Sequence, residues 1–455
     1  MARKRARRET SAKTVDVRAS STVDDLLSAA LERGDGGFET GRYLITFKEG
    51  AAEGATESLG PEGLGMRVAT ARDFDDQAMS FEAVGDADAV VFPEVGVALV
   101  GAGALAERDL GVNAEIAADS PIESIEPEYF AFPQATRESL LRDPAEVPTR
   151  IDPLEYIRGF ARAADVIASG LNVSEAGGTE AETEEEALVL GATWGLIRCK
   201  VPPSARSGVG IRVAVLDDGM DLGHPDFVGR TIVGRTFVGL PVQTLLNHGT
   251  HLIGTACGPK APPGATPRYG IGYRAPIFVG RIVGNSGSTT TATVLAGLNW
   301  AIANRCVAIL VAIGSPTPVS AAYTAAGQAA LNRGCIIVAP SGSSGGPVGA
   351  PANSPTIMSV ASLDPNLAPS PFSNFGKIDI AAPGRDIFSS VPRPRRYATS
   401  SGTSHAAAHV AGCAALWAET APGMRGMVLW RKLLTSAKRL PYPPARVGAG
   451  LVQAP

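Results

Sequence analysis

The alternation of short apolar segments with longer helical segments, from about Trp194 onward, most constrains the fold of this chain. The apolar segments lack a regular polar alternation, which is typical of parallel strands buried on both faces. Their sequences are GIRVAVLDDG, APIFVGRIVG, CVAILVAIG, GCIIVAPSG and TIMSVAS. The helical segments between or after them are HGTHLIGTACG, TTTATVLAGLNWAIAN, SAAYTAAGQAALNRG and TSHAAAHVAGCAALWAE. We therefore predict an α/β fold for residues 193–455, with a doubly wound, mostly parallel sheet flanked by helices.

A smaller α+β unit is predicted for residues 41–133, which contain the strand-like segments RYLITFKEG, DADAVVFPEVGVALVG and ESIEPEYFAF. Residues 1–40 are expected to form a basic, largely disordered tail with one short helix that begins after Thr22 and stops at Gly34. Residues 134–192 are expected to form a connector, with one amphipathic helix followed by the acidic run GGTEAETEEEA.

Composition limits the partners and the compartment. A formal net charge of -4 over 455 residues gives no general reason to expect nucleic acid. No apolar region follows the basic start MARKRARR, and the run CVAILVAIG is too short to span a membrane. The cysteines number five and lie in apolar surroundings, as buried thiols in a reducing compartment do. We expect a cytoplasmic protein with no membrane or nucleic-acid partner, and export by another route stays open.

Three polar residues lie at predicted strand ends or helix starts, where an α/β sheet of this kind places its functional side chains. Ligands bind outside the carboxyl ends of the strands. Asp217 ends a predicted strand, and His248 and Ser404 each open a predicted helix. Acyl transfer requires a hydroxyl that an adjacent base makes nucleophilic and a carboxylate that orients the base. The three residues supply one of each.

Three sequence blocks strengthen this interpretation: VAVLDDGMDLGHPDF, HGTHLIGT and GTSHAAAHVAG. Together with SPFSNFGKIDIAAPG, they make residues 194–455 resemble a subtilisin-like serine protease, or subtilase. The resemblance implies a serine endopeptidase that cleaves polypeptide substrates through an acyl-enzyme. In that mechanism Ser404 attacks the scissile carbonyl, His248 takes and returns the proton, and Asp217 fixes the histidine tautomer.

The N-terminal unit also resembles a part of these proteases. RYLITFKEG and ESIEPEYFAF are similar to the first and last strands of the family's inhibitory propeptide. The resemblance implies a self-inhibited zymogen, in which the chain's own N-terminal domain is an intramolecular inhibitor and chaperone. The position of any self-cleavage is left open, because the connector is longer than the family's junction.

Several positions differ from the family pattern. The side chain of the oxyanion hole, an asparagine in the family, is here Ser343, which would act with the Ser404 backbone N–H. A weakened oxyanion hole leaves an alternative, a peptide-binding or scaffold module. His405 and Ala408 replace the methionine and proline that follow the nucleophile in the family. The resemblance also places one wall of the P1 pocket at Ala312, Ile313 and Gly314, with Gly349 as a floor that admits a large apolar or aromatic side chain.

Metal ions offer a further alternative. His248 pairs with His251 and His405 with His409 at helical spacing, and imidazole suits zinc, but no glutamate, cysteine or other ligand completes a site. We therefore expect no cofactor. Calcium stays possible through the resemblance, with Asp226 as the single candidate ligand.

Overall fold

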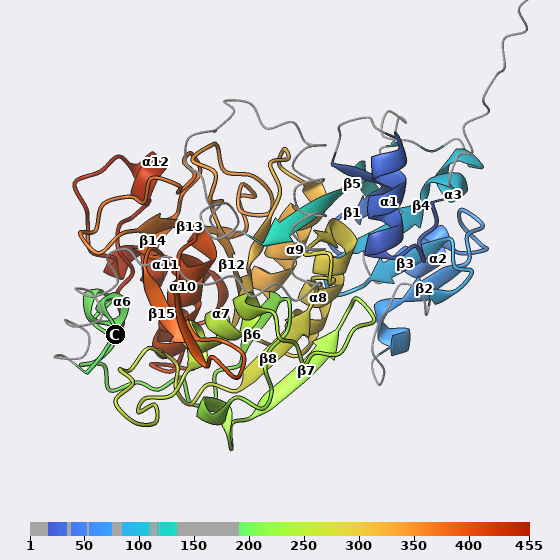
Figure 1. Cartoon of the computed structure of the whole chain (residues 1–455). Coiled ribbons are helices and arrows are strands. Elements are labelled where there is room, and N and C mark those ends of the chain that lie inside the picture. Colours follow the sequence, from blue (N-terminus) through green and yellow to red (C-terminus); the bar gives the residue numbers. More distant parts are fainter. Residues whose placement is uncertain are drawn as a thin grey trace, which may run out of the picture.

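The computed structural model describes residues 17–33, 38–51, 54–74, 84–108, 110, 116–117, 119–133 and 191–455. The described residues between 17 and 133 form an N-terminal unit, and residues 191–455 form a larger C-terminal unit (Figure 1). Most of the predicted connector, its amphipathic helix and Gly34 lie outside the described residues.

The C-terminal unit is built on a seven-stranded sheet with the order β14-β13-β12-β10-β6-β8-β7, in which every neighbouring pair is parallel. This confirms the predicted doubly wound α/β fold. The strands are β6 (Val213–Asp217), β7 (Ile232–Thr236), β8 (Ile277–Arg281), β10 (Ala308–Val311), β12 (Ile336–Pro340), β13 (Met358–Leu363) and β14 (Ile380–Pro383).

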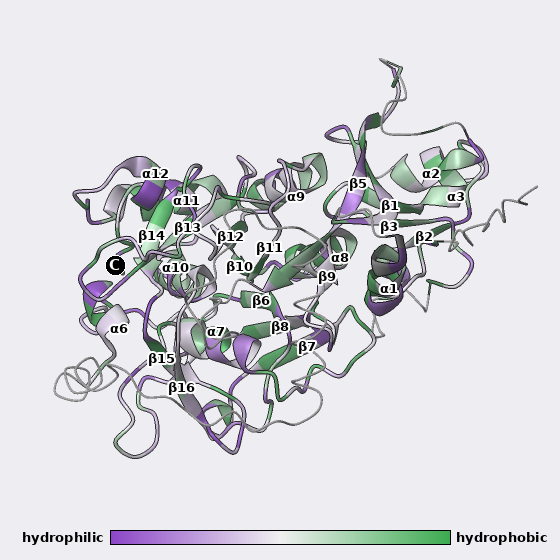
Figure 2. Cartoon of the chain, turned by 45° about the horizontal axis from the view of Figure 1, so that its top comes forward, coloured by the Kyte–Doolittle hydropathy of each residue, from purple (hydrophilic) through white to green (hydrophobic). Residues whose placement is uncertain are grey.

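Helices cover both faces of this sheet, and successive residues of each strand face opposite sides. Val213 and Val215 belong to a core with residues of α7 (Asn247–Cys257), α10 (Thr403–Ala418) and α11 (Gly426–Ser436). Ala214 and Leu216 belong to a second core with residues of α8 (Thr291–Ala303) and α9 (Ala321–Asn332). Burial on both faces explains why the strands lack polar alternation, and Figure 2 shows β6 and β8 coloured as hydrophobic.

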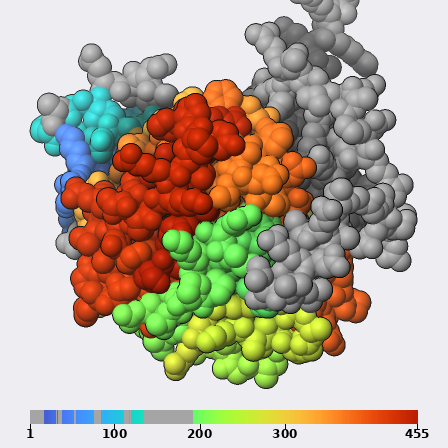
Figure 3. All heavy atoms as spheres, turned by 90° about the vertical axis from the view of Figure 1, so that its left-hand side faces the viewer, coloured from blue at the N-terminus to red at the C-terminus, as the bar shows by residue number. Residues whose placement is uncertain are grey.

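Shorter elements complete the C-terminal unit. They are α6 (Trp194–Arg198), η5 (Pro225–Phe227), the antiparallel hairpin of β15 (Ile387–Ser390) and β16 (Tyr397–Ser400), and α12 (Pro444–Val447). Figure 3 shows that residues from the last third of the chain form much of the face opposite the N-terminal unit. All five cysteines are buried and reduced. Within the described residues, no helix combines the length and apolar character needed to span a membrane.

The N-terminal unit is a largely antiparallel sheet with the strand order β5-β1-β4-β3-β2. Its strands are β1 (Glu39–Phe47), β2 (Val68–Thr70), β3 (Ala89–Phe92), β4 (Val97–Gly101) and β5 (Ile122–Pro133). The segment DADAVVFPEVGVALVG therefore forms the hairpin β3–β4. The short helices are α2 (Ala55–Leu59), η2 (Ala71–Phe74) and α3 (Ala102–Ala106).

The helix α1 (Val23–Arg33) precedes this sheet and packs against it. Its N-terminus is capped as predicted, because the Thr22 hydroxyl accepts a hydrogen bond from the Asp25 N–H at 3.1 Å. Leu26 is only 1% exposed and shares a core with aromatic residues of β5. Residues 17–33 therefore belong to the folded N-terminal unit, whereas the sequence indicated that they lie in the tail of residues 1–40.

Strand β5 joins the two units. Beyond the N-terminal sheet, its last residues pair antiparallel with β9 (Thr289–Thr290) on one side and with β11 (Ile313–Gly314) on the other. The end of the N-terminal unit therefore lies as an added strand between two segments of the C-terminal unit.

Candidate active site

The structure brings Asp217, His248 and Ser404 together in one hydrogen-bonded chain. His248 Nδ1 lies 2.9 Å from each Asp217 carboxylate oxygen, and His248 Nε2 lies 3.0 Å from Ser404 Oγ. Asp217 is the last residue of β6, while His248 and Ser404 are the second residues of α7 and α10. The carboxyl edge of the sheet and the starts of two helices on the same face therefore meet here.

Asp218, the next residue in the chain after Asp217, also belongs to this site. Its backbone N–H donates to Asp217 Oδ1 at 2.8 Å, and its own carboxylate accepts from the Gly249 N–H at 2.7 Å. A Cβ at Gly249 would collide with this carboxylate and with the Gly219 carbonyl. Burial and the neighbouring Asp217 raise the pKa of Asp218 to about 7. Asp217 thus faces the imidazole, while Asp218 fixes the backbone beside it.

The charge of Asp217 controls the basicity of His248. Burial alone would lower the pKa of the imidazole, because it disfavours the charged form. The adjacent Asp217 carboxylate outweighs burial, and the pKa of His248 is raised above its ordinary value of 6.5. The contact also holds a proton on Nδ1 and leaves Nε2 free to accept one from the Ser404 hydroxyl.

The remaining histidines of the helical pairs do not form a zinc site. His251 Nε2 lies 2.9 Å from the Ile387 carbonyl, and His409 Nδ1 lies 2.9 Å from the His405 carbonyl, so each of these nitrogens carries a donor proton. Burial lowers the pKa of His251 to about 3 and that of His409 to about 4. Within the residues that the structure covers, no three histidine, cysteine or carboxylate groups are placed to bind one metal ion.

Ser343 lies in the loop after β12, beside the first residue of α10. Its hydroxyl oxygen accepts a hydrogen bond from the Thr403 N–H at 3.1 Å and lies 3.1 Å from the Thr403 hydroxyl. The loop around it is held by Asn374, whose Oδ1 accepts from the N–H groups of Ser344 and Gly346. Ser343, the predicted oxyanion residue, therefore contacts Thr403, the residue that precedes Ser404, and its loop is hydrogen-bonded to Asn374.

The predicted wall of the P1 pocket is in contact with β5. Gly314 is paired with Phe132 and Ile313 with Pro133, while Ala312 is fully buried. The structure gives Gly349 a role other than an open pocket floor. An added Cβ there would collide with the Ser315 carbonyl, so the glycine allows two backbone segments to approach closely. The preference for a large P1 side chain therefore stays a prediction that Gly349 does not support.

The surroundings of Asp226 do not fit calcium. The Tyr397 hydroxyl lies 2.9 and 3.1 Å from the two carboxylate oxygens of Asp226, and the Tyr269 hydroxyl donates to the same carboxylate. Burial, with Asp226 nearby, raises the pKa of Tyr397 to about 12, so this hydroxyl keeps its proton. Calcium requires six to eight oxygen ligands. Here phenol donors occupy the carboxylate instead and link the turn at η5 to the loop after α7 and to β16.

A parallel sheet that carries an aspartate, a histidine and a serine in hydrogen-bonded contact, in that order along the chain, is the arrangement of the subtilisin-like hydrolases. Comparisons with known proteins agree. Residues 208–450 match the model of the subtilase family, and the chain belongs to that family. It is a subtilisin-like serine protease.

The similar proteins cover most of the C-terminal unit. The chain is 34% identical over 282 residues to an alkaline protease of Alkalihalobacillus alcalophilus, which covers 60% of this chain and 72% of the relative. It is 35% identical over 268 residues to subtilisin Savinase of Lederbergia lenta, across 57% of this chain and 96% of the relative. A solved structure of a cold adapted subtilisin-like serine proteinase superposes with a TM-score of 0.52 at 28% identity, over 58% of this chain and 98% of that one.

The tyrosine contacts of Asp226 generate a stability prediction. Tyr397→Phe removes the one hydroxyl proton that Tyr397 shares between the two oxygens of a buried carboxylate, and we expect the free energy of unfolding to fall by about 1–3 kcal/mol. Thermal or denaturant unfolding measures this change. Tyr442→Phe, at a tyrosine 37% exposed, is the matched control and should have little effect.

The same unfolding experiment tests the fit to calcium. We expect added calcium neither to raise the midpoint of the wild type through Asp226 nor to rescue Tyr397→Phe. A calcium-dependent rise in the midpoint that Asp226→Asn abolishes would show that the carboxylate does bind the ion.

Proposed function

We propose that this protein is a serine endopeptidase in which Ser404, His248 and Asp217 form the catalytic triad. The observation that supports it is the continuous chain of contacts of 2.9–3.0 Å from carboxylate to imidazole to hydroxyl. His248 removes the Ser404 proton as the hydroxyl oxygen attacks the scissile carbonyl, and the imidazolium then protonates the leaving amine. Water, activated by the same imidazole, hydrolyses the acyl-enzyme and restores the serine.

The negative charge of the tetrahedral intermediate would develop at the start of α10. The Ser404 backbone N–H and the Ser343 hydroxyl are the proposed donors to it, and the positive end of the helix dipole favours charge at this place. Thr403 holds the Ser343 oxygen there through its N–H. Because a serine side chain is shorter than an asparagine, we expect slower turnover than a carboxamide would give.

We also propose that the protein is made as a self-inhibited zymogen. Strand β5 lies between β9 and β11, where an extended peptide would pair with the enzyme by main-chain hydrogen bonds. Its last described residue, Pro133, is opposite Ile313 in the wall assigned to the substrate. The N-terminal unit therefore occupies the position proposed for the substrate.

Two acidic residues of β5 hold this strand on the C-terminal unit. Glu126 accepts from the N–H groups of Ala321 and Ala322 at 2.9 and 3.1 Å, at the start of α9. Glu128 accepts from the Ala292 N–H at 3.0 Å, at the start of α8. A carboxylate at a helix N-terminus satisfies free N–H groups and interacts favourably with the dipole.

A second candidate function is that of a peptide-binding module with little catalytic activity. The serine at position 343, in place of the family's asparagine, is the observation that favours it. An active-site probe separates this candidate from the protease.

The test of the protease is covalent labelling by a fluorophosphonate probe. We expect one equivalent of label on protein freed of its N-terminal unit, located at Ser404 by peptide mapping, and none on the same protein carrying Ser404→Ala. A probe requires both a nucleophilic hydroxyl and its base, so a folded scaffold would not react. No labelling of protein that has shed its N-terminal unit would favour the scaffold.

The oxyanion role of Ser343 has its own test. Ser343→Ala removes one donor, and we expect kcat for a peptide substrate to fall roughly a hundred-fold with little change in KM. The neighbouring Ser344→Ala is the control, because Ser344 is exposed and its hydroxyl contacts Asn374. An unchanged kcat in Ser343→Ala would remove this residue from the oxyanion hole.

A further inference from the structure

The side of β5 that faces away from the C-terminal unit is covered by other residues of the N-terminal unit. A bound peptide substrate would lack this cover. Side chains of a strand alternate between its two sides. Ala131 belongs to the core that includes α8, whereas Phe130 and Phe132 belong to a separate core with α1. Both phenylalanines are fully buried. A peptide substrate in this position would present these two side chains away from the enzyme.

Helix α1 forms the apolar part of this cover. Leu26, Leu27 and Ala30 are 1%, 6% and 2% exposed and share the core with the two phenylalanines. Phe38, which follows α1 in the chain, contacts the Phe132 ring edge-on at a centroid distance of 6.1 Å, and its carbonyl accepts from the Phe130 N–H at 2.8 Å. The N-terminal segment therefore encloses β5 on the side opposite the C-terminal unit.

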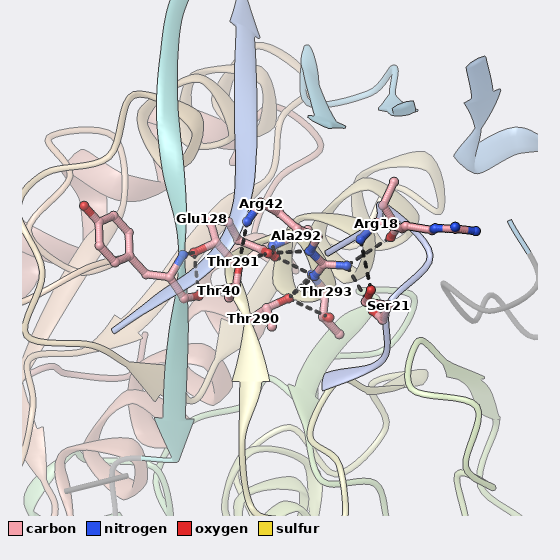
Figure 4. A network of polar contacts seen from close by, with 11 residues as sticks. Arg18, Ser21, Thr40, Arg42, Glu128, Thr290, Thr291, Ala292 and Thr293 are labelled. Carbon is pink, nitrogen blue, oxygen red and sulfur yellow. Dashed lines mark hydrogen bonds and ion pairs between the residues drawn. The ribbon is translucent and has the colours of Figure 1, made fainter. Parts of the chain in front are cut away.

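A buried arginine forms the polar part of the cover (Figure 4). Arg42 is fully buried and binds Glu128 of β5 through two nitrogens, at 2.6 and 2.9 Å. Its Nη1 donates to the carbonyl oxygens of Ala19 and Ser21 at 3.0 and 3.1 Å, just before α1. Its Nη2 also lies 3.3 Å from the Thr290 hydroxyl of β9.

The guanidinium of Arg42 thus links three parts of the chain, which are the segment before α1, strand β5 and strand β9. A paired buried arginine is costly to break, because the partner that remains would be an uncompensated buried charge. The contact depends on the segment before α1, whose two carbonyls satisfy Nη1. If α1 left, Arg42 would lose these acceptors and the two phenylalanines would become exposed.

We infer that residues 17–30 form a clasp, an interaction surface for β5 that keeps this strand in the substrate cleft after the chain is cut. The inference rests on the self-inhibition proposed above and adds the segment that regulates it. The partner of the outer face of β5 is therefore a helix of the same chain. Loss of α1 from β5 should therefore weaken the pairing of the inhibitory strand with β9 and β11.

Hydrogen–deuterium exchange of the full chain in a Ser404→Ala background tests the clasp without any cleavage. Leu26→Ala combined with Leu27→Ala removes apolar contacts of α1 with β5. We expect exchange at the amides of β5 and β11 to accelerate by at least about ten-fold. Ser28→Ala is the matched control, because Ser28 lies on the exposed side of the same helix. The amides of β6 and α10 should be unchanged and report that the C-terminal unit stays folded.

Equal exchange at β5 in the double variant and the control would overturn the clasp, whatever the activity of the wild type. If the double variant unfolds throughout, the single Leu26→Ala gives the same comparison with a smaller change. Failure of the proposed function is separate, since it would appear as an unlabelled Ser404 in protein from which the N-terminal unit has been removed. With both correct, the N-terminal fragment of the cut wild type stays bound in size-exclusion chromatography, and that of the double variant dissociates.

Discussion

The hydrogen-bonded contact of His248 with both Asp217 and Ser404 is the interaction on which the rest of the structure depends. It requires the end of a buried strand and the first turns of two helices to meet within hydrogen-bond distance. Helices α7 and α10 achieve this by packing closely on one face of the sheet. Gly412 of α10 is important there, because a Cβ would lie 2.8 Å from Ile271 Cβ and 3.0 Å from the Ala256 carbonyl oxygen. Small residues thus allow the helices to present the imidazole and the hydroxyl to each other.

The last strand of the N-terminal unit pairs with segments of the C-terminal unit that are assigned to substrate binding. This strand enters between β9 and β11 and is held at both neighbouring helix starts by Glu126 and Glu128. The site that would stabilise a substrate strand therefore stabilises the chain's own strand first. In the proposed zymogen, activity would depend on how quickly that strand leaves, and we infer that the contacts on its outer side control this rate.

Much of the fold was predictable because local sequence patterns dictate it. The apolar runs became the parallel strands β6, β8, β10, β12 and β13, and the segment HGTHLIGTAC became α7. The Thr22 cap of α1 was also predictable, since it depends on residues three positions apart. The proposed triad was predictable as a set of residue types in order, and the structure adds the distances.

Other features depend on contacts between distant segments, which one sequence does not reveal. The two-residue strands β9 and β11 are strands through their pairing with β5. The polar residues before Gly34 indicated a tail, yet α1 finds its apolar partners in Phe130 and Phe132, about 100 residues later. Asp226 matched a calcium ligand of the family, and only the three-dimensional position of Tyr269 and Tyr397 shows that phenols occupy it.

The most direct test of the central claim is the pH dependence of fluorophosphonate labelling of Ser404, compared between wild type and Asp217→Asn after the N-terminal unit has been removed from both. The neutral imidazole is the active base, so the labelling rate should fall as the pH decreases through the pKa of His248. Because Asp217 raises that pKa, the midpoint of the wild type should lie above 6.5. Asp217→Asn should label far more slowly and shift the midpoint to lower pH. Equal rates and equal midpoints in the two proteins would contradict the account.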